Sequence, residues 1–437
     1  MTTIRYRLEK DIPVLREVDV CVVGGGPGGL GAAVTAARQG VSVLLVERYA
    51  GLGGMAWQGE VEPFMPNHAS GKTLDRPIYG EWREAMYRYL PPKQRQTTAF
   101  DPEAREWVQM LISKDTAMLA AEDLCLAAGV RLLYHHTLCD VVKRDGRIEA
   151  AVFQSKSGLA AVKAKIFVDG TGDGDLSMLA GCPFEYGNED GFCQPMTLCF
   201  KLCDIDVARM PKREEINAVY QKAKESGELS CPRENILIFG TLESDVIHFN
   251  TTRVIKKNAT LAAELSEAEV EARRQMRQIL DFMRKRVAGF EEARIHSVAT
   301  HIGVRESRRI RGRQYLTVAD FEQARKFPDA IARVSYPIDI HNPSGSGTII
   351  KHVPEGDWYE IPYGCIVPQG CDNLLVGMRG ISVDHALHSS MRVMPPVCSI
   401  GQAAGMAAAS AAQCNCKPAE LDGVEIRKKL VAFGANL

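Results

Sequence analysis

The residues of this chain with the clearest chemical meaning form the segment GGGPGG (24–29), in which Gly24, Gly26 and Gly29 give the spacing G-x-G-x-x-G. Glycines at this spacing allow a tight turn and let the backbone approach a pyrophosphate, while a following helix N-terminus supplies N–H donors and positive potential. Glu47, about twenty residues further on, can accept hydrogen bonds from a ribose diol and would repel a 2′-phosphate. The spacing predicts a dinucleotide site.

The elements needed to position this segment are present around it. The runs 19–23 and 41–46 are apolar and β-branched, and residues 30–39 between them are alanine-rich. This order predicts a strand, a glycine turn, a helix and a second strand, with strands buried on both faces as in a parallel sheet. Further strands are predicted at 130–134, 138–142, 148–154, 164–168 and 373–377. Helices are predicted from Asp101-Pro102-Glu103 to about 128, from a capping box of Ser266 and Glu269 to 286, and over 397–412.

Three further segments favour FAD over a smaller dinucleotide. Gly53-Gly54-Met55 offers a second backbone loop to the phosphates, and DGTGDGD (169–175) follows a late strand. Residues 377–402 join a strand to a helix whose N-terminus would stabilise an anionic reduced flavin. The chain has no second G-x-G-x-x-G after a strand. A dehydrogenase that uses NAD alone is the alternative, and it explains only the first motif.

Composition excludes several classes of protein. The chain has 437 residues, 53 Lys and Arg against 54 Asp and Glu, and a net charge of -1. This balance gives no reason to expect nucleic acid or a membrane surface as a partner, and no apolar run is long enough to span a bilayer. The 13 cysteines include no C-x-x-C pair, so we predict no metal site, free thiols and a cytoplasmic location.

The segment VVGGGPGGLGAAVTAARQGVSVLLVER (22–48) resembles the opening of the glutathione-reductase-like FAD oxidoreductases. Within them the chain is most similar to a broad bacterial family of FAD-dependent oxidoreductases, mostly without an assigned substrate. The resemblance extends to GLGGMAWQGEVEPF (51–64), IFVDGTGDGDLSMLAG (166–181), HIGVRESRRIRG (301–312), PDAIARVSYPIDIH (328–341), YEIPYGCIVP (359–368) and NLLVGMRGISVDHALHSSMRVMPPVCSIGQAAGMAAA (373–409).

The resemblance implies an α/β fold with a discontinuous Rossmann-like FAD-binding domain and an inserted β-rich substrate domain. The FAD-binding domain is expected to comprise residues 1–60, 101–181 and 359–437. The substrate domain is expected to comprise 61–100 and 182–358. The active site is then expected where the two domains meet.

The resemblance also implies individual contacts with FAD. The adenosine would contact Gly24, Gly26, Glu47 and Arg48, and the phosphates would contact Pro27, Gly28, Gly29, Gly53 and Gly54, with Met55 beside them. A strand backbone at Val141 would lie beside adenine, Thr171 and Gly172 would pass the ribose and phosphates, and Arg379 and Gln402 would lie near the ribityl chain and ring.

Candidate catalytic groups occur in the segment YPIDIH (336–341). Alternation along an extended segment places Asp339 and His341 on one face, near the phenol of Tyr336, and an imidazole with an ordinary pKa would exchange protons near neutrality. Arg305 lies in a charged cluster and either binds a substrate carboxylate, steadies reduced flavin or joins an internal salt-bridge network. His301, His385 and His388 are weaker candidates.

These observations predict an FAD-dependent oxidoreductase that transfers a hydride between a small organic substrate and N5 of the flavin. In this interpretation His341 is an acid or base and Arg305 is an orienting cation. A flavin-binding scaffold without catalytic activity is a second alternative. The expected partner is a small molecule, with neither nucleic acid nor a membrane, and a homodimer is expected from base rates alone.

Overall fold

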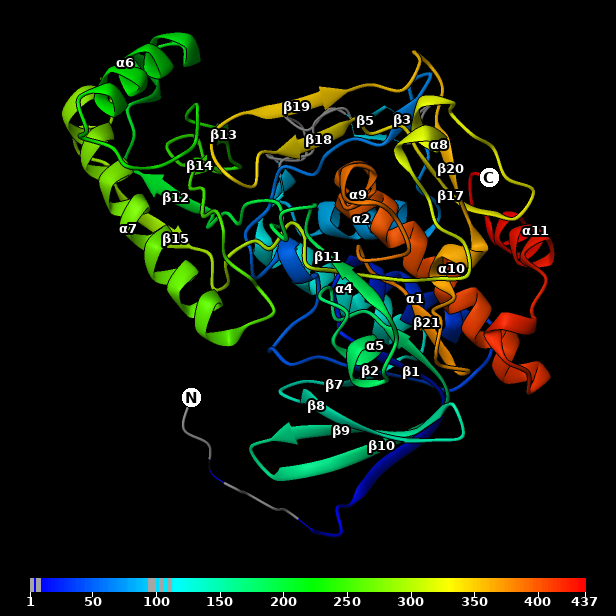
Figure 1. Ribbon diagram of the computed structural model, residues 1–437. Helices are drawn as coiled ribbons and strands as arrows, with labels where there is room; N and C mark the ends of the chain where they lie inside the picture. Colours follow the sequence, from blue (N-terminus) through cyan, green and yellow to red (C-terminus); the bar gives the residue numbers. More distant parts are fainter. Residues whose placement is uncertain (1–3, 5–8, 93–99, 102–105, 108–111) are drawn as a thin grey trace.

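The computed structural model describes residues 4, 9–92, 100–101, 106–107 and 112–437. Segments from both ends of the sequence gather in one α/β region, drawn in blue, cyan and orange to red in Figure 1. Green segments form a second region beside it, which we call the cap (residues 200–298).

The α/β region is built on a seven-stranded sheet. Parallel pairing joins the first five strands named below, and the last two extend the sheet in antiparallel fashion. The strands are β7 (Arg131–Leu133), β2 (Val43–Val46), β1 (Val14–Val23), β10 (Gly158–Asp169), β21 (Leu374–Val376), β9 (Arg147–Ser155) and β8 (Thr137–Arg144).

The register of the parallel strands brings several chemistry-bearing segments to one edge of this sheet. Val23 pairs with both Val46 and Asp169, and Asp169 pairs with Val376. The residue after each of these strand ends is therefore at the same edge, although the four segments are far apart in the sequence. This edge is where ligands bind in open α/β sheets.

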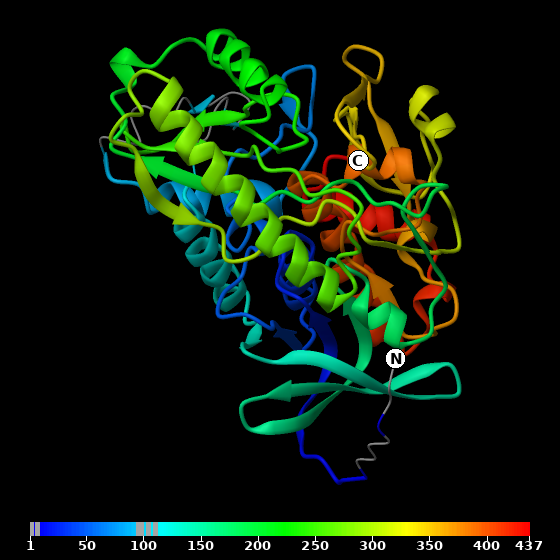
Figure 2. The same cartoon turned by 60° about the vertical axis from the view of Figure 1, so that its left-hand side comes forward.

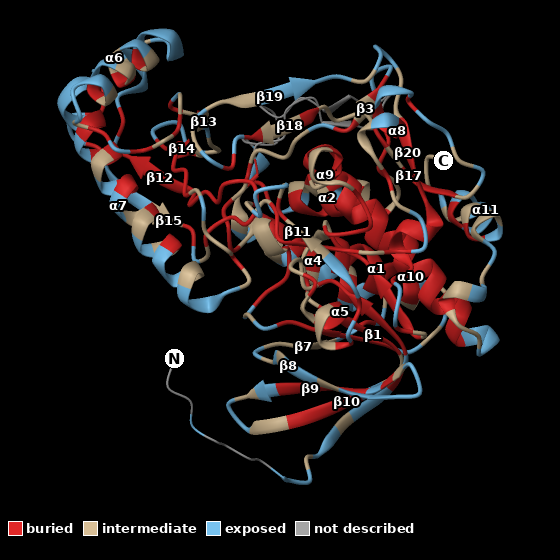
Figure 3. Cartoon of the chain, viewed as in Figure 1, coloured by how far each residue is buried: buried red, intermediate tan, exposed pale blue. Residues whose placement is uncertain are grey.

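Two long helices cover the sheet, and small residues let them pack very closely. α1 (Pro27–Arg38) and α10 (Met394–Cys414) approach until a Cβ added at Gly401 would lie 1.8 Å from the carbonyl oxygen of Gly28. A Cβ added at Gly405, about one turn later, would lie 2.2 Å from the carbonyl oxygen of Ala32. The two helices are therefore fixed relative to each other, and α10 is buried along most of its length (Figure 3).

Shorter elements complete this part of the molecule. The helices are α2 (Ile78–Arg88), α4 (Lys114–Ala127), α5 (Asp175–Leu179), α8 (Val318–Glu322), α9 (His385–Met391) and α11 (Gly423–Phe433), with 3-10 turns at Gly54–Ala56, Tyr363–Ile366 and Pro418–Glu420. The two-stranded pairs are β3 (His68–Ala69) with β4 (Lys72–Thr73), β5 (Phe100–Asp101) with β6 (Glu106–Trp107), β11 (Phe184–Tyr186) with β16 (Arg308–Ile310), β17 (Ala330–Val334) with β20 (Tyr359–Pro362), and β18 (Ile338–His341) with β19 (Thr348–Lys351).

The cap has a hydrophobic core of its own, which includes stacked rings of Phe200 and Phe249 with centroids 4.8 Å apart. Its antiparallel sheet comprises β13 (Ile238–Gly240), β14 (Ile247–Phe249), β12 (Phe200–Cys203) and β15 (Arg294–Val298), beside helices α6 (Arg213–Glu225) and α7 (Ala262–Arg286) and a 3-10 turn at Val207–Arg209. Figure 2 shows α7 running along this sheet. Polar contacts hold the cap to the loop after the 3-10 turn Gly54–Ala56, because Lys201 Nζ lies 2.6 Å from Glu62 Oε1.

The sequence predictions for the sheet are confirmed, but two predicted helix starts are wrong. The strand–turn–helix–strand unit and the hairpin turn at Asp145-Gly146 are present. Asp101 lies in β5, Pro102 and Glu103 lie outside the described residues, and α4 begins after Ser113, whose hydroxyl accepts from the backbone N–H of Thr116 at 3.2 Å.

The second wrong start is the capping box of Ser266 and Glu269. Both residues lie inside α7, which begins at Ala262 because the preceding alanines extend the helix. Glu269 instead accepts from the backbone N–H of Ile302 at 2.7 Å and so ties α7 to the segment after β15. The division into two domains at the predicted boundaries stays a prediction.

Candidate active site

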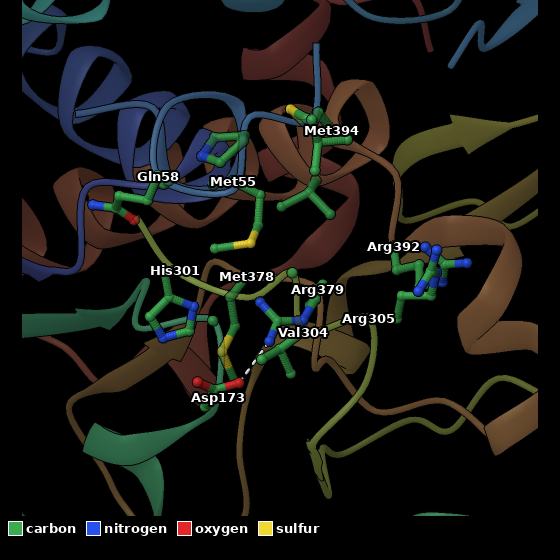
Figure 4. Close-up of a pocket in the computed structure, with 18 of the residues that line it drawn as sticks. Met55, Gln58, Asp173, His301, Val304, Arg305, Met378, Arg379, Arg392 and Met394 are labelled. Atoms are coloured by element: carbon green, nitrogen blue, oxygen red, sulfur yellow. Dashed lines mark hydrogen bonds and ion pairs between the residues drawn. The ribbon is translucent and has the colours of Figure 1, made fainter. Parts of the chain in front are cut away.

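A cavity of about 600 Å³ lies where the common edge of the parallel strands faces the cap and the β18–β19 pair. Figure 4 shows side chains from several elements pointing into it. Fifteen of the residues predicted from the sequence line it: Gly24, Gly26, Pro27, Gly28, Glu47, Arg48, Gly54, Met55, Thr171, Gly172, Arg305, Tyr336, Asp339, His341 and Arg379. The structure therefore brings the predicted cofactor residues and the predicted catalytic residues together.

The glycine turn at one end of the cavity combines packing constraints with open space. Gly24 has φ +100°, a conformation that favours glycine, and a Cβ added at Gly28 would lie 2.0 Å from the carbonyl oxygen of Gly377. Gly26 differs, because a Cβ there would meet nothing closer than the Cα of Gly54 at 3.9 Å. Protein packing therefore explains Gly28, whereas only the space in the cavity explains the absent side chain at Gly26.

This turn fits the pyrophosphate of a dinucleotide. Gly26 is the N-cap of α1, and no side chain caps the helix or places an acid in its first turn. The N–H donors of a helix start and its positive potential bind phosphate groups well. The space beside Gly26 lets the phosphate approach them.

The next part of the cavity carries groups suited to adenosine. One carboxylate oxygen of Glu47 accepts from the N–H of Gly25 at 2.7 Å, and the other accepts from the N–H of Tyr49 at 2.9 Å. These bonds hold the buried carboxylate at the edge of the cavity, where its remaining lone pairs can accept from ribose hydroxyls. The guanidinium of Arg48 lies over the Tyr49 ring, 4.8 Å from its centroid.

A second helix N-terminus opens onto the same cavity. α10 starts without a side-chain cap, and Val393, Met394 and Val397 at its first turn line the cavity. Nearby, Arg379 Nη2 donates to Asp173 Oδ1 at 2.5 Å (Figure 4). The buried Nε of Arg379 has no hydrogen-bond partner among the residues that the structure describes. A helix N-terminus and an unsatisfied guanidinium N–H together suit the electron-rich edge of a reduced flavin.

Four predicted cofactor residues lie outside the cavity lining: Gly29, Gly53, Val141 and Gln402. Val141 lies in the middle of β8. The residues that line the cavity here are His136, which precedes β8, and Thr137 and Leu138, which begin it. The buried amide of Gln402 donates to the carbonyl of Arg76 at 2.9 Å and accepts from the N–H of Ile78 at 3.3 Å. Gln402 thus holds the start of α2.

The predicted group of Tyr336, Asp339 and His341 is present, but its protonation differs from the expectation. His341 Nε2 lies 3.5 Å from Asp339 Oδ2, and Arg253 Nη2 lies 3.0 Å from His341 Nδ1. Because a guanidinium only donates, Nδ1 is the unprotonated nitrogen and Nε2–H faces Asp339. Burial and the charge of Arg305 lower the pKa of His341 to about 3. The expectation that His341 exchanges protons near neutrality is therefore wrong.

The other two members of this group, Asp339 and Tyr336, are also held in fixed protonation states. Burial alone would raise the pKa of Asp339, but the hydrogen bond from His341 and the nearby arginines keep this pKa well below its ordinary value. Burial and the charge of Asp339 raise the pKa of Tyr336 to about 12. At neutral pH the group is a phenol, a carboxylate and a neutral imidazole, with Tyr336 Oη 3.4 Å from Asp339 Oδ2.

The sequence analysis missed several polar residues of this cavity. Arg233 and Asn250 come from the cap, and Arg392 precedes α10. His301, ranked as a weak candidate, also lines the cavity, and its Nδ1 donates to the carbonyl of Ile302 at 2.6 Å. Arg233 and Asn250 lie in no motif, whereas His301 and Arg392 lie in the segments 301–312 and 373–409 that carry the family resemblance. The fold brings the four together.

The sequence pattern of the family described as FAD dependent oxidoreductase matches residues 19–430. The chain belongs to this family. The family is one of flavoproteins that use FAD, which sets aside the alternative of a dehydrogenase that uses NAD alone. Most of the residues that the sequence analysis predicted to contact FAD line the cavity described above.

The curated relatives of this FAD-dependent oxidoreductase are similar over part of their length. A thiamine thiazole synthase of Methanococcus vannielii is 30% identical over 168 residues, which are 36% of this chain and 57% of the relative. A digeranylgeranylglycerophospholipid reductase of Thermoplasma volcanium is 28% identical over 155 residues, 35% of this chain and 39% of the relative. The chain thus spans about half or less of these relatives.

Solved structures resemble this oxidoreductase over most of its length at low identity. A geranylgeranyl bacteriochlorophyll reductase-like protein from Thermoplasma acidophilum has a TM-score of 0.47 and 13% identity, covering 96% of this chain and 84% of that chain. The myxobacterial chondrochloren halogenase has a TM-score of 0.43 and 14% identity, covering 95% and 78%. Likenesses at this level do not indicate a substrate.

Proposed function

We propose that this FAD-dependent oxidoreductase transfers a hydride between a C–H bond of a small organic substrate and N5 of the flavin. When bound, FAD supplies the redox chemistry by exchanging two electrons with the substrate at N5. One observation carries the proposal: the glycine turn lines the same cavity as four polar residues, Arg305, Tyr336, Asp339 and His341. A substrate beside these four residues would share the cavity with the ring.

These polar residues would bind and orient the substrate. Arg305 Nη1 donates to Pro195 O at 2.7 Å and to Thr197 Oγ1 at 2.6 Å, which fixes a cation in the cavity wall. Tyr336 keeps its proton at neutral pH and is a hydrogen-bond donor. We assign His341 the role of positioning Asp339, because its neutral Nε2–H faces that carboxylate.

The setting in which the enzyme works is part of the same proposal. All 13 cysteines are free, and most are buried, which is typical of proteins kept in a reducing cytoplasm. Within the described residues, no helix combines the length and the apolar character needed to cross a bilayer. A small-molecule substrate and a homodimer stay predictions.

Anaerobic mixing tests the proposal directly. FAD-loaded protein is mixed with a panel of small alcohols, amines, hydroxy acids and saturated acids, and the absorbance of oxidised flavin is followed; chemically reduced protein is mixed with the corresponding ketones, imines and alkenes. We expect at least one compound to bleach or restore the absorbance within a turnover time. If no member of the panel changes the flavin in either direction, the flavin-binding scaffold is the better description. If only a nicotinamide cofactor reduces the flavin and dioxygen is then consumed, hydride transfer from substrate is refuted.

A further inference from the structure

The end of the cavity beside the cap holds more positive than negative charge. Arg233, Arg305 and Arg392 line it, and Arg253 lies directly behind His341. Two of these arginines have a carboxylate nearby. Arg253 Nη1 lies 2.9 Å from Glu234 Oε2, and Arg392 Nη2 lies 4.0 Å from Asp339 Oδ2.

The two remaining arginines have no such partner. Within the described part of the chain, neither Arg233 nor Arg305 forms an ion pair. His341 is neutral, so it adds no charge of either sign. Among the described residues, two of the four guanidiniums, Arg253 and Arg392, thus have a carboxylate within ion-pair distance, and the other two have none. We call Arg233, Arg305 and Arg392 the arginine cluster.

The arginine cluster is buried enough for this imbalance to matter. Arg233 is only 7% exposed, and its Nη1 is a buried donor that has no hydrogen-bond partner in the described part of the chain. The Nε of Arg392 is a second such donor, and its side chain is 12% exposed. Burying a charged donor without a partner is unfavourable, and native proteins satisfy such groups with a counter-charge or a ligand.

The three arginines also feel one another. Burial and the charges of Arg392, Arg233 and Arg253 lower the pKa of Arg305 well below its ordinary value. Because guanidinium groups keep their proton in proteins, the lowered pKa expresses repulsion that an anion would relieve. Figure 4 shows the side chains of Arg305 and Arg392 extending toward the same part of the cavity.

The shape of the donors indicates the kind of anion. Both hydrogen bonds of Arg305 within the described chain use Nη1, which leaves Nε and Nη2 as donors, and Arg233 and Arg392 each have a buried donor free. Guanidinium groups bind planar or tetrahedral oxyanions through pairs of parallel N–H donors. Asn250 of the cap also lines the cavity, and its buried Oδ1 has no partner among the described residues, so it can accept from a hydroxyl or amino group of a ligand.

The anion expected at the arginine cluster is not a phosphate of FAD. They have their own site at the glycine turn, where the space beside Gly26 and the start of α1 receive them. The arginine cluster comes instead from the cap, from the segment after it and from the end of α9. Its unpaired donors call for a second anion, separate from the phosphates of FAD.

We propose that the substrate carries an oxyanion group, a carboxylate or a phosphate, which Arg233, Arg305 and Arg392 bind at the cap end of the cavity. This inference rests on the proposed function for the statement that the bound anion is the substrate. It assigns Arg233 and Arg392, together with Arg305, as specificity-determining residues. It also places the reacting carbon between the oxyanion and the flavin end of the cavity.

Calorimetric titration of the FAD-loaded protein tests the inference without turnover. The probes are succinate, inorganic phosphate and succinamide, which keeps the length of succinate without its charges. We expect succinate or phosphate to bind and to shift the flavin absorbance, and succinamide to bind at least about tenfold more weakly. Tighter binding of succinate indicates a carboxylate substrate, whereas tighter binding of phosphate indicates a phosphorylated one. Equal binding of all three probes, or binding of none, overturns the inference.

Variants assign the binding to the cluster. Arg233→Met is expected to weaken binding of the better oxyanion by about 10- to 150-fold, because a charge-assisted hydrogen bond is lost. Arg233→Lys keeps the positive charge but lacks the paired N–H donors of a guanidinium. Its affinity for the oxyanion is expected to lie between those of the unchanged protein and Arg233→Met. The control is Arg277→Met, which removes one positive charge from an exposed position of α7 and is expected to leave binding unchanged. FAD content and thermal unfolding are measured for each variant, and if Arg233→Met does not fold, Arg233→Lys carries the test.

The outcomes separate this inference from the proposed function. If the protein binds an oxyanion through Arg233 but no substrate reduces or reoxidises its flavin, the anion site is supported and hydride transfer is refuted. If an uncharged substrate bleaches the flavin and the protein binds no oxyanion, hydride transfer is supported and the anion site is refuted. If Arg233→Met changes FAD affinity and leaves oxyanion affinity intact, the cluster serves the flavin and the inference is wrong.

Discussion

Adding one methyl group at Gly26 should remove FAD binding while leaving the fold intact. The added Cβ would have the Cα of Gly54 as its nearest neighbour at 3.9 Å, and Gly26 has φ -70°, which any residue adopts. Alanine is a poorer N-cap than glycine, but it also restricts the unfolded chain, and the two effects oppose each other. We therefore expect Gly26→Ala to change the free energy of unfolding of the FAD-free protein by less than about 1 kcal/mol.

The effect on FAD should be much larger. The methyl group would occupy the space through which a phosphate reaches the N–H donors at the start of α1. Weakening two charge-assisted hydrogen bonds costs about 3 kcal/mol or more, which corresponds to a rise of about 100-fold or more in the Kd for FAD. Titration of the FAD-free protein, followed by the quenching of flavin fluorescence, measures this Kd, and urea unfolding measures the stability.

Gly28→Ala is the matched comparison at the same turn. Its added Cβ would lie 2.0 Å from the carbonyl oxygen of Gly377, so the loop after β21 must move. We expect this variant to lose about 1–3 kcal/mol of stability even without FAD. The reasoning is refuted if Gly26→Ala binds FAD within threefold of the unchanged protein, or if the two variants are equally destabilised.

Four further changes test other parts of the molecule. Glu47→Gln replaces one acceptor oxygen that faces a backbone N–H, so we expect about 1–2 kcal/mol less stability and about tenfold weaker FAD binding, and an unchanged Kd would contradict the assignment. The pKa of His341 is lowered to about 3, so its contribution to stability is present above pH 6.5 and is lost as the pH falls toward 3. Between pH 7 and pH 5 the unchanged protein should lose about 2 kcal/mol of unfolding free energy through this residue. In urea unfolding, His341→Gln should therefore lose about 2 kcal/mol less than the unchanged protein over the same pH range. Tyr336→Phe should keep FAD and lower turnover, and turnover equal to that of the unchanged enzyme would remove Tyr336 from the site. Gly401→Ala should destabilise by about 1–3 kcal/mol in urea unfolding, because the added Cβ would lie 1.8 Å from the backbone of α1, and unaltered stability would show that the helices can separate.

Local patterns predicted the glycine turn and the elements on either side of it, because these are contiguous in the sequence. The glycine turn needs only a strand before it and a helix after it, and both are visible as apolar runs. Strand ends at Val23, Val46, Asp169 and Val376 then align by the register of a parallel sheet. The sequence shows each strand but not the order in which the strands pair.

Elements governed by long-range packing could not be predicted in the same way. Gln402 has the polarity expected near a cofactor, yet its amide satisfies the backbone at the start of α2, a partner more than three hundred residues away in sequence. Arg233 and Arg392 come from segments whose approach depends on how the cap docks. His341 shows the same limit, since its pKa is set by burial and by Arg305, neither of which its neighbours in sequence disclose.

The proposed function requires that the flavin and the substrate occupy neighbouring parts of one cavity. A crystal structure of the FAD-loaded protein with succinate or phosphate tests this directly. We predict density for the pyrophosphate beside Gly26, for the ring near Met55, Met378 and Arg379, and for the added oxyanion against Arg233, Arg305 and Arg392 on the side of the ring away from the glycine turn. Density that places the ring outside this cavity, or that leaves the three arginines separated from it by a protein wall, would contradict the account.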